Sequence, residues 1–119
     1  MAFIRASQGG GGGGGGSVVG IDSYFDNQIV SSTTATITGL SSYSKVIIIL
    51  SCSLQSGKDI NYMKDYCYMN GYSPIMESGQ YKNSSSSSHL VRTYVRDNTF
   101  GDSLTITGKW NGYQVLGVS

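Results

Sequence analysis

The sequence predicts an all-β domain, a β-sandwich or jelly roll of about seven or eight short antiparallel strands. From Ser17 onward apolar and polar residues alternate with a period of two, and no window of about a dozen residues has the spacing of an amphipathic helix. Turns rich in Gly, Ser and Asn separate the apolar runs. Because no crossover helix is predicted, a parallel α/β fold is not expected.

The chain divides into an N-terminal arm, residues 1–17, and one β-domain, residues 18–119. Gly9 to Gly16 are eight consecutive glycines, and no residue type loses more backbone freedom on ordering. The run is either a flexible linker or an arm that docks on a neighbouring subunit. Fully extended, it spans on the order of 25 to 29 Å, which would carry Phe3 and Ile4 well away from their own domain.

Three strands are predicted in the first half of the domain. Val18–Phe25 is a short additional strand, and Thr33–Leu40 alternates β-branched and small residues before a turn. Lys45–Leu54 is predicted to be central and covered on both sides for part of its length, because Ile47 and Ile49 make its second face apolar as well. The first face of that strand is predicted to carry Val46, Ile48, Leu50, Cys52 and Leu54.

Two Asn-Gly dipeptides predict β-hairpins with two-residue turns. Asn70-Gly71 follows the segment Tyr62–Met69, and the return strand would be Tyr72–Met76. Pro74 cannot donate a hydrogen bond to a neighbouring strand, so the return strand is expected at a sheet edge or to be irregular.

The second half of the domain contains one further strand and the second hairpin. A serine-rich loop, residues 82–88, precedes the strand Leu90–Asp97. Ser103–Trp110 and Tyr113–Val118 flank Asn111-Gly112, which predicts a C-terminal hairpin with Trp110 opposite Tyr113. Most of the core is expected from the central strand and the strand at 90–97, with Leu104, Ile106 and Val115 from the last hairpin.

Charge and hydropathy exclude several classes of partner. Charged residues make up 13% of the chain, and the net charge is +1. We therefore expect no nucleic-acid binding and no attraction to anionic membranes. The most apolar run, residues 46–50, is too short to cross a bilayer, and no export signal precedes the glycines, so we expect a soluble chain made in the cytoplasm.

The chain has two cysteines, Cys52 and Cys67. Both lie in strand-like segments beside apolar residues, so both are expected to be buried. A chain made in the cytosol normally keeps its thiols reduced, and the sequence therefore favours two buried thiols over a disulfide.

No arrangement typical of a catalytic or metal site is found, so we expect a protein that is not an enzyme and binds no metal or cofactor. His89 is the only histidine and is expected to lie exposed in a turn rather than to act as a base. One His with two separated Cys does not match a zinc pattern. Asp97 and Asp102 flank a turn and are expected to bond to local backbone rather than to form a glycosidase pair.

Among the polar residue types, tyrosine says most about a possible interaction site, and the chain has nine tyrosines. Strand alternation predicts that two groups of aromatic and basic side chains face outward, as at protein interfaces and at sites that stack on sugar rings. The alternatives are an ordinary half-exposed face, a subunit interface and a ligand site. The residues are Tyr62, Tyr66 and Tyr68 on one strand, and Arg92, Tyr94 and Arg96 on another.

An N-terminal tip, a glycine run and a Ser/Thr/Tyr-rich β-domain without an export signal together resemble a small virion protein of a tailed bacteriophage. The resemblance rests on residues 1–17 and on the stretch Gly-Leu-Ser-Ser-Tyr-Ser-Lys-Val-Ile-Ile-Ile-Leu at 39–50, which is similar to β-sandwich domains of tail, fibre and head-decoration proteins. It implies a location in the virion, a homo-oligomer, favouring a trimer, and contacts with other virion proteins. It also implies an attachment tip formed by Phe3, Ile4 and Arg5.

The expected function is therefore a structural or attachment component of a phage particle. It would assemble through its arm and its β-sandwich. The alternative is a carbohydrate-binding module that recognises a host surface glycan through exposed tyrosines, among them Tyr62, Tyr66, Tyr68 and Tyr94.

Overall fold

The computed structural model describes residues 16–25, 31–54, 65, 67–80 and 88–119. These residues form eight antiparallel strands in two sheets and no helix, which confirms the predicted fold class. The strands are β1 (Val18–Phe25), β2 (Ser31–Ile37), β3 (Lys45–Leu54), β4 (Tyr68–Met69), β5 (Met76–Gln80), β6 (Ser88–Asp97), β7 (Leu104–Trp110) and β8 (Gly112–Val118).

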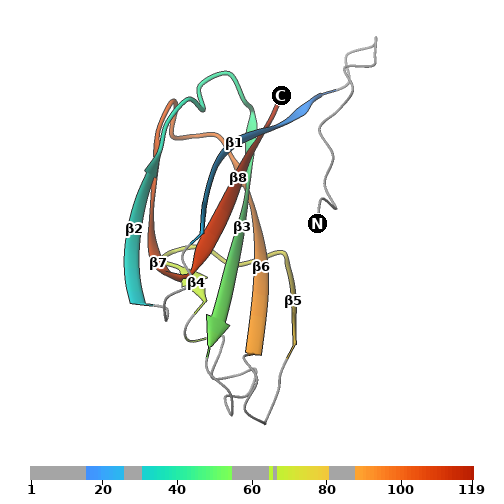
Figure 1. Cartoon of the computed structure of the whole chain (residues 1–119). Coiled ribbons are helices and arrows are strands. Elements are labelled where there is room, and N and C mark those ends of the chain that lie inside the picture. The colour runs from blue at the N-terminus through green and yellow to red at the C-terminus, as the bar shows by residue number, and fades with distance from the viewer. Residues whose placement is uncertain (1–15, 26–30, 55–64, 66, 81–87) are drawn as a thin grey trace.

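The two sheets pack face to face as a sandwich. One sheet has five strands in the order β1-β8-β3-β6-β5, and the other has three in the order β2-β7-β4. Figure 1 shows β2 and β7 in one layer and β8, β3 and β6 in the other. Because β1 pairs with β8, the first and last strands of the domain are neighbours. This order is that of a jelly roll, except that β5 pairs with β6.

The core lies between the sheets, and β3 supplies much of it. Ten residues of β3 pair with β6, and seven also pair with β8, so the prediction of a central strand is confirmed. The inward-facing side chains of β3 are Val46, Ile48, Leu50 and Cys52. They pack with Ile37 of β2, with Leu104 and Ile106 of β7, and with Val115 of β8.

The predicted hairpin at Asn70-Gly71 is wrong. β4 pairs with β7 and β5 pairs with β6, so the segments on either side of the turn belong to different sheets. Gly71 has a φ of 79°, but Asn70 does not have a positive φ, as a type I′ turn requires. The Tyr72 N–H donates to the Met69 carbonyl at 3.3 Å, which with these φ values is the pattern of a type II turn. The predicted return strand Tyr72–Met76 does not form: residues 72–75 are irregular, which was one of the two expected outcomes, and the edge strand β5 begins only at Met76.

The predicted C-terminal hairpin is also wrong, because the chain crosses from one sheet to the other between β7 and β8. Asn111 lies at this corner, only 4% exposed, and its side-chain oxygen accepts the Ser53 N–H. A Cβ at Gly112 would lie 2.6 Å from the Tyr24 carbonyl oxygen, so the corner brings β1 too close for a side chain. Trp110 and Tyr113 do meet, with their ring centroids 6.2 Å apart, but across the two sheets.

The expectation of two reduced thiols is overturned: Cys52 and Cys67 form a disulfide. Cys52 is on β3 and Cys67 lies directly before β4, and their Cα atoms are 5.7 Å apart. Both residues are buried, as predicted, with exposures of 2% and 0%. The alternation of residues along each strand does not show that the two cysteines are close in space; only the fold brings them together. The bond therefore ties the segment before β4 to the five-stranded sheet.

Asp102 connects two turns at one end of the sandwich. Its carboxylate accepts the backbone N–H groups of Gly39 and Ser41, both at 3.3 Å. Asp102 therefore binds backbone, as predicted, but in a distant turn and not in its own. Asp97 instead forms an ion pair with Lys45 at the ends of β6 and β3. The bond from the Gly39 N–H, followed by those from Ser41, holds the pKa of Asp102 below its usual value of 3.8.

The Asp102 carboxylate makes stability depend on pH in acid. Because its pKa is lower in the folded state, its contribution is complete above about pH 4 and is lost as the pH falls through the folded pKa. We expect Asp102→Asn to reduce the loss of stability below that pH, as measured by urea unfolding midpoints across an acid series. Asp97→Asn removes the other carboxylate with a lowered pKa, so comparing the two variants shows how much of the acid sensitivity comes from each carboxylate. Equal acid sensitivity of wild type and Asp102→Asn would contradict this assignment.

Candidate interaction surface

Strand β6 faces the opposite way from the sequence prediction. Arg92, Tyr94 and Arg96 were expected to point outward, but Tyr94 pairs with Ile48 of β3 and is fully buried in the core. Arg92 and Arg96 share its side of the strand. The alternation of β6 is compatible with either orientation, because its other side carries Val91, Thr93 and Val95.

The two arginines are accommodated at the core side of β6 by specific partners. Arg92 donates to the Cys67 carbonyl at 2.9 Å and pairs with Glu77 at 3.0 Å. The Arg96 guanidinium lies 4.3 Å from the centroid of the Tyr72 ring, a cation–π contact. Burial raises the pKa of Tyr94 above its usual value. These contacts explain how a strand with two arginines presents this side to the interior.

Those of the predicted tyrosines and arginines that the structure describes do not come together in one surface. Tyr68 is half-buried on β4 in the three-stranded sheet, where it pairs with Lys109 of β7. Tyr94 is inside the core. Tyr62 and Tyr66 lie outside the described residues, as do Phe3, Ile4 and Arg5 of the predicted attachment tip.

The orientation of β6 creates an apolar outer face on the five-stranded sheet, the feature that sequence patterns missed. The register places Ile47 opposite Val95 and Leu116, and Ser51 opposite Val91. None of these side chains belongs to the core cluster. Ile49 is only 5% exposed, yet it too is absent from the core, because it lies on this face among its strand neighbours. No described element packs over this face.

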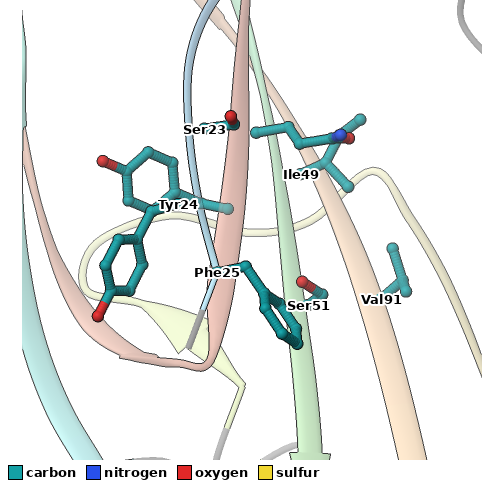
Figure 2. Close-up of a pocket in the computed structure, with 8 residues that line it drawn as sticks. Ser23, Tyr24, Phe25, Ile49, Ser51 and Val91 are labelled. Carbon is teal, nitrogen blue, oxygen red and sulfur yellow. The ribbon is translucent and has the colours of Figure 1, made fainter. Parts of the chain in front are cut away.

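A hollow of about 380 Å³ lies on the outer face. Its lining comes from β3, β6, β8 and β1 and includes two tyrosines from the core side at the end of the sandwich: Ser23, Tyr24, Phe25, Ile49, Ser51, Val91, Tyr113 and Gln114. Figure 2 shows the Phe25 ring beside Ser51 at the edge of this hollow. Phe25 is 74% exposed, and Met76 of β5, at the opposite edge of the sheet, is 68% exposed. Two large apolar side chains therefore project into solvent on either side of a depression.

The outer face of the three-stranded sheet is different in character. Its cross-strand neighbours are exposed threonines whose hydroxyls meet across β2 and β7. The Oγ1 atoms of Thr34 and Thr107 are 3.3 Å apart, and those of Thr36 and Thr105 are 3.1 Å apart. Such a face is stable in water, as is usual for one side of an antiparallel sheet. The sandwich thus has one outer face of exposed hydroxyl groups and one of apolar side chains.

On the outer face itself, His89 lies in β6 rather than in the predicted turn, and is exposed. The Ser53 Oγ is 2.8 Å from the His89 Nδ1. A serine next to a histidine becomes a nucleophile only with a group that orients the ring and an oxyanion site. The expectation of a non-enzymatic protein stays a prediction.

The core side of β1 and β8 holds a second tyrosine pair, at the end of the sandwich. Tyr24 stacks on Tyr113 with centroids 5.9 Å apart, and the Tyr113 hydroxyl donates to Asp22 at 3.0 Å. Burial, and then the nearby Asp22 carboxylate, raises the pKa of Tyr113 to about 12. This phenol is therefore a hydrogen-bond donor at neutral pH and stabilises the edge strand β1.

Comparison with protein-family models, with curated proteins and with solved structures finds no match to this chain. Within the described ranges, no group of three or more His, Cys, Asp and Glu side chains is placed to hold a metal ion. The same residues contain no helix with the length and hydropathy needed to span a membrane. The surface geometry is therefore the observation from which a function can be argued.

Proposed function

We propose that this protein is a structural or attachment subunit of a bacteriophage particle, located in the virion, with a non-catalytic role. It would assemble as a homo-oligomer through its β-sandwich and contact other virion proteins through its arm. The phage origin is supported by the resemblance in layout: an apolar tip, eight glycines and a small β-domain.

The observation that carries a role in assembly is the apolar outer face of the five-stranded sheet. Exposed apolar patches of this kind mark interaction sites in soluble proteins. Burial of such a face removes apolar surface from water, which favours association. In such an assembly the apolar face of the five-stranded sheet would contact a neighbouring subunit, and the threonine face of the three-stranded sheet would stay in solvent.

The point at which the arm joins the domain supports the same proposal. Ser17 and Ser119 join the beginning of β1 to the end of β8: the Ser119 N–H donates to the Ser17 carbonyl at 3.1 Å. The chain therefore enters the domain at a fixed corner, next to the end of β8. An arm starting there can reach a neighbour without disturbing the sandwich.

The carbohydrate-binding alternative is less well supported by this geometry. A sugar ring stacks on an exposed aromatic face. Tyr94, one of the four tyrosines predicted for that role, is fully buried. Tyr68 is half-buried on the other sheet, so these two predicted tyrosines do not form a common platform.

The proposal is tested by mass spectrometry of density-purified phage particles from cells that carry the coding sequence. We expect peptides of this chain to remain with the particles at constant stoichiometry. We expect replacement of Phe3 and Ile4 by Ser to release the chain from the particles. The control Thr105→Ser, a mild change on the exposed threonine face, should leave the chain bound. Recovery of the chain only in the particle-free fraction would overturn the proposal.

A further inference from the structure

We infer that a second copy of this chain packs on the outer face of the five-stranded sheet around a two-fold axis, with Phe25 of each copy entering the hollow of the other. The inference rests on the proposed assembly function and names its partner and contact surface. It is carried by four properties of the face: its area, its charge, its shape and its width relative to the N-terminal tip.

The area of the face is sufficient for a stable dimer. Five strands about 4.8 Å apart, each about eight residues long at about 3.3 Å per residue, make a face of roughly 600 Å². Two copies packed through it would bury roughly 1,200 Å² in total, which exceeds the approximately 1,000 Å² expected of a biological interface. Sheets that pack face to face in this way keep a separation of about 10 Å, filled by their side chains.

The charge distribution suits contact between identical faces. A two-fold axis brings each charge near its own copy, so an unpaired charge on the face would be repelled. Among the described side chains of this face, the only Lys, Arg, Asp and Glu are Lys45 and Asp97, which pair with each other at one end. The centre, around Ile49, is uncharged.

The shape of the face is complementary to itself. A two-fold contact requires that one surface contain both the projection and the recess that receives it. Phe25 projects beside the hollow that Ile49 and Val91 line. A phenyl ring buries about 150 to 250 Å² when enclosed, which makes Phe25 the expected anchor of the contact. Met76, at the other edge, extends the apolar contact across the sheet.

The N-terminal tip is a poorer candidate to cover this face. Its large apolar side chains before the glycines are Met1, Phe3 and Ile4. One extended segment covers a width of about 4.8 Å, a fraction of a five-stranded face. A second copy covers all five strands at once.

The test is the mass of the full chain in solution by light scattering at several protein concentrations. We expect the wild type to have the mass of two chains, a dimer, at concentrations on the order of tens of micromolar. Phe25→Asp should weaken the association by about 30-fold or more, because it removes the anchor and places two carboxylates in an apolar contact. Met76→Asp provides a second variant at the opposite edge. Both positions are exposed, so both variants should fold, which circular dichroism checks.

The matched control is Thr107→Asp, a similar charge on the outer face of the three-stranded sheet, which should leave the dimer unchanged. Replacing Phe3 and Ile4 by Ser should also leave it unchanged. A monomeric wild type, a trimer, or a dimer that resists both Phe25→Asp and Met76→Asp would overturn the inference. A dimer sensitive to Phe25→Asp that is absent from phage particles would overturn the proposed function alone.

Discussion

Loss of the Cys52–Cys67 disulfide is expected to lower the free energy of unfolding by about 3 kcal/mol. The two cysteines are 15 residues apart, and cross-linking a loop of this size removes conformational entropy mainly from the unfolded chain. The measurement is urea unfolding of the wild type with and without a reductant. Reduction keeps both sulfur atoms in the core and so isolates the effect of the covalent bond.

The double variant Cys52→Ala with Cys67→Ala separates the cross-link from packing. It should be at least as unstable as the reduced wild type, because it also removes two buried sulfur atoms. Reductant should have no effect on this variant. Identical unfolding of oxidised and reduced wild type, or a count of two free thiols in the untreated protein, would contradict the prediction.

Asn98→Ala is expected to lower the free energy of unfolding by about 3 kcal/mol, through loss of several hydrogen bonds from one side chain. The Asn98 Nδ2 lies 2.8 to 3.0 Å from the carbonyl oxygens of Leu40, Tyr43 and Gly101, so its two N–H groups are shared among three acceptors. Its oxygen accepts the N–H groups of Phe100 and Gly101 at 3.1 and 2.9 Å. One side chain therefore holds together the turn after β6 and the loop between β2 and β3.

Two further variants make the Asn98 prediction specific. Asn98→Asp keeps the oxygen that accepts two bonds but places a carboxylate against three carbonyls, so it should be about as destabilising as Asn98→Ala. Asn70→Ala makes the same side-chain change at an exposed turn and should alter stability by no more than about 0.5 kcal/mol. The measurement is chemical unfolding of all three variants. A stable Asn98→Asp variant would show that the donated bonds contribute little.

The alternating pattern of the sequence was sufficient to predict the fold class and most strands. Lys45–Leu54 was predicted with the bounds that β3 has, and its apolar face at Val46, Ile48 and Leu50 lies in the core. These predictions succeed because the alternation of side chains along a strand is a local property. The central position of β3 follows from its apolar content, which favours the interior of a sheet.

Strand pairing could not be predicted in the same way, because it depends on segments far apart in the chain. Asn-Gly favours a hairpin locally, but at Asn111 the pairing of β8 with both β1 and β3 outweighs one hairpin turn. The disulfide depends on the same long-range arrangement, since Cys52 and Cys67 become neighbours only when β4 joins β7 over the core.

The apolar outer face depends on the orientation of β6, which the sequence pattern does not predict. Composition and alternation are properties of the chain, so the sequence alone predicts a small all-β domain preceded by eight glycines. Which side of β6 faces inward was decided by the tertiary structure. Arg92 and Arg96 can lie on the core side only because Glu77 and Tyr72 are brought to meet them, and that choice leaves Val91 and Val95 on the outer face.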